Sequence, residues 1–138
     1  MTQVTVYVTR RGRIMGYTAV GHTLYAESGA DPVCAGVSTL TQSTVNALQG
    51  VAGVTPRVLR RPGALAARIS RSSGMRWHDA QIILRACAFG LEQLERQFPS
   101  FVRVRYRLDE SGSAGTIRRK EAGYGKLHNG RRHSIIRP

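Results

Sequence analysis

The first residues of the chain alternate apolar and polar side chains in two short runs. Residues 4–8 (VTVYV) alternate and are rich in β-branched side chains, which predicts a strand. Gly12 supplies a turn, and residues 14–20 (IMGYTAV) predict a second strand that leads directly to His22. The chain therefore opens with a β-hairpin that carries His22 at its far end, followed by a loop over residues 23–30.

A helix is predicted directly after this loop. Asp31 suits the N-cap, and Pro32 suits the first helical position, because proline has no N–H group to lose there. An imperfect helical stripe of apolar residues then continues as far as Gly50, which can end the helix. Cys34 lies in the first turn of this predicted helix.

The second half of the chain is again predicted to form a hairpin followed by a helix. Residues 57–70 predict a hairpin that turns at Pro62-Gly63. Residues 79–98 carry a broad apolar face at helical spacing, and Pro99 stops this helix. Residues 101–108 (FVRVRYRL) alternate strictly and predict a last strand.

The predicted order is ββαββαβ, which is an α+β fold with a mixed sheet of about five strands packed with two helices. From residue 109 the periodic pattern fails, and the remaining segment is basic and rich in glycine. We therefore expect one α/β domain over residues 1–108 and a disordered basic tail over residues 109–138.

The charge of the chain narrows the choice of partners. Its 138 residues carry a net charge of +13. Residues 1–108 contain 14 Lys/Arg and 5 Asp/Glu, a net +9, and residues 109–138 contain 7 and 3, a net +4. Such a balance favours an anionic partner, such as nucleic acid, a ribonucleoprotein or an acidic membrane. Arg103, Arg105 and Arg107 form a basic stripe on one face of the last strand, which is either a solvated outer face or an anion-docking surface for ribosomal RNA.

Cysteine content and the N-terminus suggest a compartment. The two cysteines are Cys34 and Cys87, and nothing in the sequence resembles a signal peptide or a membrane span. We expect a cytoplasmic protein whose thiols stay free.

Cys34 is the candidate nucleophile. In the first turn its sulfur would lie near unpaired backbone N–H groups and the positive end of the helix dipole. A helix end contributes roughly 0.3–1 kcal/mol at an exposed site, against about 1.4 kcal/mol for one pKa unit, so it leaves a thiol largely protonated near neutrality. A second cationic partner is needed, and His22 is the nearest candidate in the sequence.

Simpler interpretations stand beside this one. A cysteine in an apolar helix is usually a small buried hydrophobe, which is the interpretation preferred for Cys87. Asp31 is more often a plain N-cap than a third catalytic group. His78 precedes the long helix and is expected to be a solvated or capping residue. His128 and His133 lack the cysteine partners of a zinc site, so no metal is expected.

Two segments carry a family resemblance. Gly21-His22, a short loop and DPVCAGVSTL (31–40) resemble the signature of the ribosomal-processing cysteine protease family, Prp, and GLEQLERQFPSFVRV (90–104) is similar to the family's last helix and strand. The resemblance covers about residues 3–108. It departs from the family at Pro32, where an aliphatic residue is more usual, and in the tail, which lies outside the family pattern.

The resemblance implies a usually dimeric α/β protein with a Cys-His dyad and no cofactor, in which His22 is the base and Cys34 the nucleophile. It implies removal of a short N-terminal extension from a large-subunit ribosomal protein. We expect backbone N–H groups at the start of the Cys34 helix to receive the oxyanion, and the loop to fold over the substrate with freedom at Gly21 and Gly29. The alternative is a non-catalytic basic module that binds RNA or ribosomes.

Overall fold

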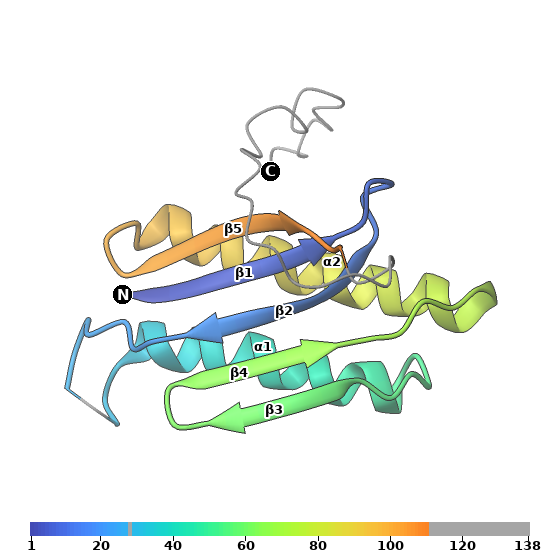
Figure 1. The fold of residues 1–138 in the computed structure, drawn as a ribbon. Helices are drawn as coiled ribbons and strands as arrows, with labels where there is room; N and C mark the ends of the chain where they lie inside the picture. The colour runs from blue at the N-terminus through green and yellow to red at the C-terminus, as the bar shows by residue number, and fades with distance from the viewer. Residues whose placement is uncertain (28, 111–138) are drawn as a thin grey trace, which may run out of the picture.

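A computed structural model of the chain describes residues 1–27 and 29–110. It contains five strands and two helices in the predicted order ββαββαβ (Figure 1). The strands are β1 (Thr2–Val8), β2 (Ile14–Val20), β3 (Arg57–Arg61), β4 (Ala64–Arg68) and β5 (Val102–Leu108), and the helices are α1 (Pro32–Gly50) and α2 (Gly74–Gln97).

The strands form one mixed sheet in the order β3-β4-β2-β1-β5. The β1–β2, β2–β4 and β3–β4 pairs are antiparallel, whereas β1 and β5 are parallel. A parallel pair needs a long crossover, and here the intervening chain includes both helices. Both helices lie on one face of the sheet, and neither α1 nor α2 covers the other face (Figure 1).

The core lies between this sheet and the two helices. Alternate residues of β1 point into it, and Val4, Val6 and Val8 are almost fully buried. They pack with Leu48 of α1 and Leu91 of α2 in one continuous apolar cluster. The alternation in β1 and the helical stripes are thus the two patterns that this cluster requires.

Three features of the sequence prediction differ from the structure or extend it. The second helix begins at Gly74, five residues before the predicted start at Asp79, and it ends at Gln97. Its N-cap, Ser73, makes no side-chain capping hydrogen bond, so the usual start signal is missing. Beyond the predicted boundary at residue 108, the Asp109 N–H group donates to Val8 O at 2.7 Å.

The remaining predicted tail, residues 111–138, lies outside the described residues, so the boundary stays a prediction. Within the described part of the chain, neither helix is long and apolar enough to cross a membrane.

Candidate active site

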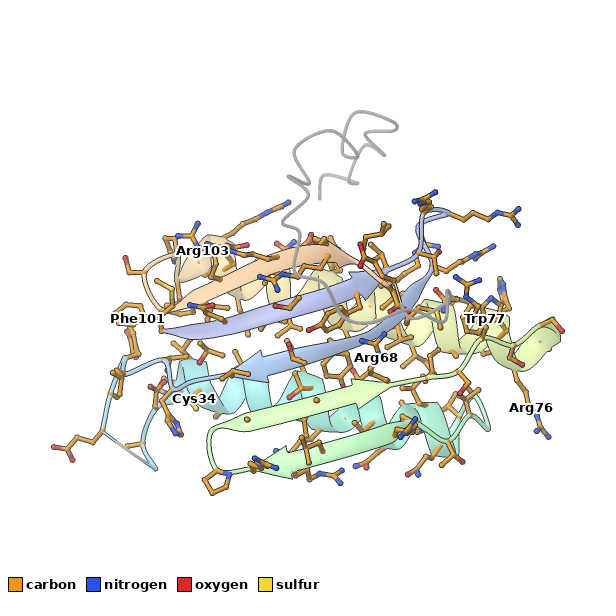
Figure 2. The ribbon with its side chains drawn as sticks, viewed as in Figure 1. Cys34, Arg68, Arg76, Trp77, Phe101 and Arg103 are labelled. Atoms are coloured by element: carbon orange, nitrogen blue, oxygen red, sulfur yellow. The ribbon has the colours of Figure 1, made fainter. Side chains whose placement is uncertain are left out.

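Cys34 is the third residue of α1, as its predicted cap implies. The Asp31 side chain is the N-cap, because its Oδ1 accepts hydrogen bonds from the N–H groups of Val33 at 3.0 Å and Cys34 at 2.9 Å. Pro32 occupies the first position, where it leaves no donor unsatisfied. The Cys34 side chain is half-buried and lies near the end of β2 (Figure 2).

The second carboxylate oxygen of Asp31 holds the loop that follows His22. Oδ2 accepts hydrogen bonds from the buried Thr23 hydroxyl and from the N–H groups of Tyr25 at 3.0 Å and Ala26 at 3.4 Å. Partial burial raises the pKa of Asp31, but these bonds and the bond from Cys34 N–H outweigh it and lower the pKa from 3.8 to about 2. Asp31 is therefore an ionised clasp that joins the loop to the helix carrying Cys34.

The same loop is held at a second point by an aromatic cluster. The Tyr25 ring packs edge-on against Phe98, at 5.5 Å between centroids, and against Phe101, at 5.1 Å. These two rings lie where α2 ends and β5 begins. Tyr25 thereby fixes one side of the loop against the body of the protein.

His22 is brought toward Cys34 by two glycines. Gly21 has φ +97°, a conformation that side chains rarely adopt, and its N–H group donates to Gly63 O at 2.8 Å. A Cβ placed on Gly63 would lie 2.8 Å from His22 Nε2, so the imidazole lies directly against the β3–β4 turn. The backbone of that turn thus fixes where the His22 ring can lie.

Cys34 and His22 line the same cavity, which has a volume of about 280 Å³. Its walls come from the end of β2, the first turns of α1 and the β3–β4 hairpin. In the part of the chain that the structure describes, no hydrogen bond joins the two side chains or connects Asp31 with His22. Catalytic hydrogen bonds often tighten only when substrate binds, so shared access to one cavity is the relevant geometry here.

Six further polar side chains of the cavity were not predicted from the sequence, and two of them, Thr2 and Thr41, donate their hydroxyls to backbone oxygens. Ser38 and Gln42 follow Cys34 at intervals of four residues on α1, a helical spacing that would have indicated a shared face. Arg60 and Arg61 come from β3 and make the wall basic, with no Asp or Glu among the lining residues. Only the pairing of β3 with β4, and of β4 with β2, brings these two arginines to the cavity.

One chemical expectation is wrong. The N–H groups of Val33 and Cys34 donate to Asp31 Oδ1, and that of Ala35 donates to Asp31 O at 3.0 Å. These groups are already satisfied by the cap, so they are not the oxyanion donors that the sequence suggested. Of the uncharged side-chain donors that line the cavity, Thr2 and Thr41 donate to Gly21 O and Val37 O, which leaves Ser38 and Gln42 for an oxyanion.

The other singled-out residues lie elsewhere. Gly29 is exposed, with open space around its Cα, and Arg103, Arg105 and Arg107 lie on β5 away from the cavity. Cys87 is buried in the core, where burial raises the pKa of its thiol and a hydrogen bond with Thr44 lowers it.

The described residues contain no group of three or more His, Cys, Asp or Glu side chains that could hold a metal ion. His128 and His133 lie outside the described residues.

Known proteins that are shorter than this chain resemble it in sequence and in fold. A ribosomal processing cysteine protease Prp of Staphylococcus aureus is 28% identical over 107 residues, which are 78% of this chain and all of that protein. The Prp of Bacillus subtilis is 27% identical over 116 residues, covering 75% of this chain and 96% of the relative.

Solved structures agree with these sequence matches. A crystal structure of the essential ribosomal processing protease Prp from S. aureus, in complex with a covalently linked product peptide, matches with a TM-score of 0.72 at 27% identity. The match covers all of that protein chain and 78% of this one. A protein from Streptococcus mutans matches with a TM-score of 0.68 at 28% identity, over 79% of this chain and 96% of its own.

The sequence model of one family accounts for most of the domain described above. The model for cysteine protease Prp matches residues 1–103, which include the loop, the cap, Cys34 and the start of β5. This chain therefore belongs to the Prp family of cysteine proteases.

Proposed function

We propose that this protein is an endopeptidase that removes a short N-terminal extension from a large-subunit ribosomal protein, with Cys34 as nucleophile and His22 as general base. The observation that carries the proposal is the cavity that both side chains line. A buried structural cysteine has no need of such access, and Cys87, in the core, provides the contrast within the same chain.

The reaction follows from these two groups. The His22 imidazole takes the proton of the Cys34 thiol, and the sulfur attacks the scissile carbonyl carbon. The tetrahedral intermediate collapses as the imidazolium gives its proton to the leaving amine, which departs and leaves a thioester. Water then attacks the thioester with His22 as base, which releases the acid product and restores the thiol. The Ser38 hydroxyl and the Gln42 amide, which line the cavity, are the proposed donors to the oxyanion.

The solved relatives support this assignment. The S. aureus protease has been crystallised with a covalently linked product peptide and with a substrate peptide. A covalent link to product is the behaviour expected of a nucleophilic enzyme. By similarity, a ribosomal protein precursor is the proposed substrate of this chain, the cytoplasm its proposed compartment and a homodimer its proposed state.

The test is cleavage of a synthetic peptide that spans the extension of a large-subunit ribosomal protein from the same organism, followed by mass spectrometry. Cys34→Ala and His22→Ala should each abolish cleavage, because the first removes the nucleophile and the second removes the group that accepts and returns the proton. The matched controls are Cys87→Ala and His78→Ala, which remove the same chemical groups from the core and from the exposed side of α2. Circular dichroism should show all four variants folded.

Retained cleavage in either Cys34→Ala or His22→Ala would contradict the dyad. Absence of cleavage by the wild-type chain, together with tight binding to ribosomal particles, would favour the non-catalytic basic module instead. Alkylation separates the two cysteines independently: iodoacetamide near neutral pH should modify Cys34 and leave Cys87 unmodified, because Cys87 is buried and burial keeps its thiol protonated.

A further inference from the structure

The strand register assigns three rows of side chains to the face of the sheet that neither α1 nor α2 covers. Because cross-strand neighbours point to the same side, each row can be followed from β5 to β3. The rows are Arg107–Tyr7–Gly16–Arg68–Arg57, Arg105–Thr5–Thr18–Ala66–Leu59 and Arg103–Gln3–Val20–Ala64–Arg61. We call these fifteen positions the open face, which is the face toward the viewer in Figure 2.

The open face is strongly and asymmetrically charged. Six of its fifteen positions are arginine and none is Asp or Glu. The two complete rows on the helix side of the same strands contain one arginine, Arg60, among otherwise uncharged residues. The sheet therefore concentrates its positive charge on the side that is open to partners.

Few carboxylates neutralise this charge. Asp109 pairs with Arg68, and Glu95 of α2 reaches round the edge of the sheet to Arg103 at 3.5 Å. The other four arginines of the open face are exposed, and among the described residues they form no ion pair: they are Arg57, Arg61, Arg105 and Arg107. These four remain available to an anion in solution.

The arginines form two columns with a less charged strip between them. One column is on β5, where alternate residues lie about 6.6 Å apart, and the other is formed by Arg57 and Arg61 of β3, while the Arg68 guanidinium reaches from β4 to the Tyr7 ring of β1. Four strand spacings separate the two edges, a distance of about 19 Å. Figure 2 shows Arg103 at the β5 side and Arg68 over the middle of the sheet.

A hollow lies at the β3 side of this face. It has a volume of about 720 Å³ and is lined by Arg57, Arg68 and Arg71, by Asp109, and by apolar residues that include Leu59. The Arg68 guanidinium lies 4.8 Å from the centre of the Tyr7 ring. Apolar walls with cations at the rim suit a nucleotide, whose base is flat and whose phosphate is anionic.

We propose that the open face binds RNA, with phosphates held by the two arginine columns and one nucleotide in the hollow. All basic residues before residue 120 are arginine, and a guanidinium binds a phosphate through two parallel hydrogen bonds. A lipid surface would require a larger apolar anchor, and the large apolar side chains of this face that are more than half exposed are Val20 and Leu59. The inference goes beyond peptide cleavage, because the open face extends over all five strands and shares only Ala64 and Arg61 with the lining of the Cys34 cavity.

The test measures RNA binding by fluorescence anisotropy over a series of KCl concentrations, with the full chain and a labelled single-stranded RNA of about 16 nucleotides. Arg105→Ala/Arg107→Ala should lower the slope of log affinity against log salt by about 1.4, since each phosphate contact on a single strand contributes roughly 0.7. At 0.1 M salt that slope corresponds to roughly a 25-fold loss of affinity.

Two control variants separate position from charge. Arg76→Ala/Arg85→Ala removes the same charge from exposed positions on α2 and should leave both affinity and slope near wild type. Arg105→Lys/Arg107→Lys keeps the charge and should keep most of the slope. All three variants should cleave the short peptide at the wild-type rate, so a failure of RNA binding is distinguishable from a failure of the proposed peptidase.

The proposal is overturned if the wild-type chain does not bind the RNA at low salt, or if both alanine variants lose affinity equally. It is also overturned if Arg105→Ala/Arg107→Ala keeps full affinity. Analytical sedimentation of each variant is the last check. If the wild-type chain is a dimer that dissociates in Arg105→Ala/Arg107→Ala while RNA binding is unchanged, the open face is an interface between copies of the chain.

Discussion

Asp31 shows how much of the site depends on one side chain. One oxygen caps α1 at Val33 and Cys34, and the other holds Thr23, Tyr25 and the loop beyond His22. The position of Cys34 and that of the loop are therefore coupled through a single carboxylate. In the proposed mechanism Asp31 is a positioning residue, because its hydrogen bonds go to the loop and the helix rather than to His22.

Replacement of Asp31 by Asn and by Ala should distinguish its two functions, which are to cap α1 and to hold the loop after His22. Asparagine keeps one acceptor oxygen for the cap but presents an NH2 group to the donors of the loop, whereas alanine loses both. We expect Asp31→Asn to reduce kcat/KM roughly tenfold with helix content intact, and Asp31→Ala to reduce activity further and also lower Tm. Loss as complete as in Cys34→Ala, with Tm unchanged in both variants, would instead make Asp31 a catalytic residue.

Acid titration gives a second test of the clasp. The folded pKa of Asp31 is lowered from 3.8 to about 2, so its carboxylate stabilises the folded state fully above about pH 4. That contribution is lost as the pH falls through about 2. In denaturant titrations the wild type should therefore be more stable than Asp31→Asn above pH 4, and the difference should shrink toward pH 2. A difference that stays constant over this range would contradict the lowered pKa.

At the scale of elements, α2 is tied to the sheet by one polar side chain. Gln81 is buried, its Oε1 accepts from Ile14 N–H at 2.9 Å, and its Nε2 donates to Ile14 O at 2.8 Å. These two bonds satisfy the backbone at the start of β2, beside the bulge where the β1–β2 register shifts. The strand that leads to His22 is thereby fixed to the long helix.

Gln81→Ala should remove both partners of Ile14 at once. An unsatisfied buried backbone group costs about 1–3 kcal/mol, so the free energy of unfolding should fall by at least about 2 kcal/mol. Gln97→Ala, at the exposed end of the same helix, should change it by less than about 0.5 kcal/mol. Urea denaturation measures both values, and equal effects would show that the two bonds add nothing beyond helix propensity.

At the scale of the whole molecule, the cavity and most arginines of the open face lie in different parts of the sheet, and Arg61 belongs to both. The cavity lies at the end of the sheet where β2 leaves and α1 begins, while the open face spreads over all five strands. Residues 111–138 add seven Lys/Arg and one Glu, a net +6 beyond the described part. The two proposals above therefore give the molecule a local reaction site and a separate means of binding anions.

Deletion of residues 111–138 should leave cleavage of a short peptide unchanged, because the family match over residues 1–103 already contains Cys34, His22 and the described lining of the cavity. Binding to ribosomal particles should weaken, and its salt dependence should become shallower, since fewer phosphate contacts release fewer counterions. The open face should preserve part of the affinity. Co-sedimentation at several salt concentrations measures both quantities, and an unchanged slope would show that the tail makes no phosphate contact.

The sequence by itself determined the order of elements and the local chemistry of the helix start. Strict alternation in β1 and β5, the turns at Gly12 and Gly63, and Asp-Pro before Cys34 are short-range signals, since each depends on residues a few positions apart. The start of α2 at Gly74 was not predicted, because it lacks such a short-range signal: its N-cap, Ser73, makes no side-chain capping bond.

The tertiary structure alone decided which of these elements meet. Strand order and register brought Arg60, Arg61 and Gly63 to His22, and they assembled six arginines from three strands on the open face. The structure also showed that Asp31 occupies the helix N–H groups that the sequence offered to an oxyanion. Strand order, register and hydrogen-bond occupancy result from contacts between residues far apart in the chain, and the periodicity of one segment carries no information about its neighbours in space.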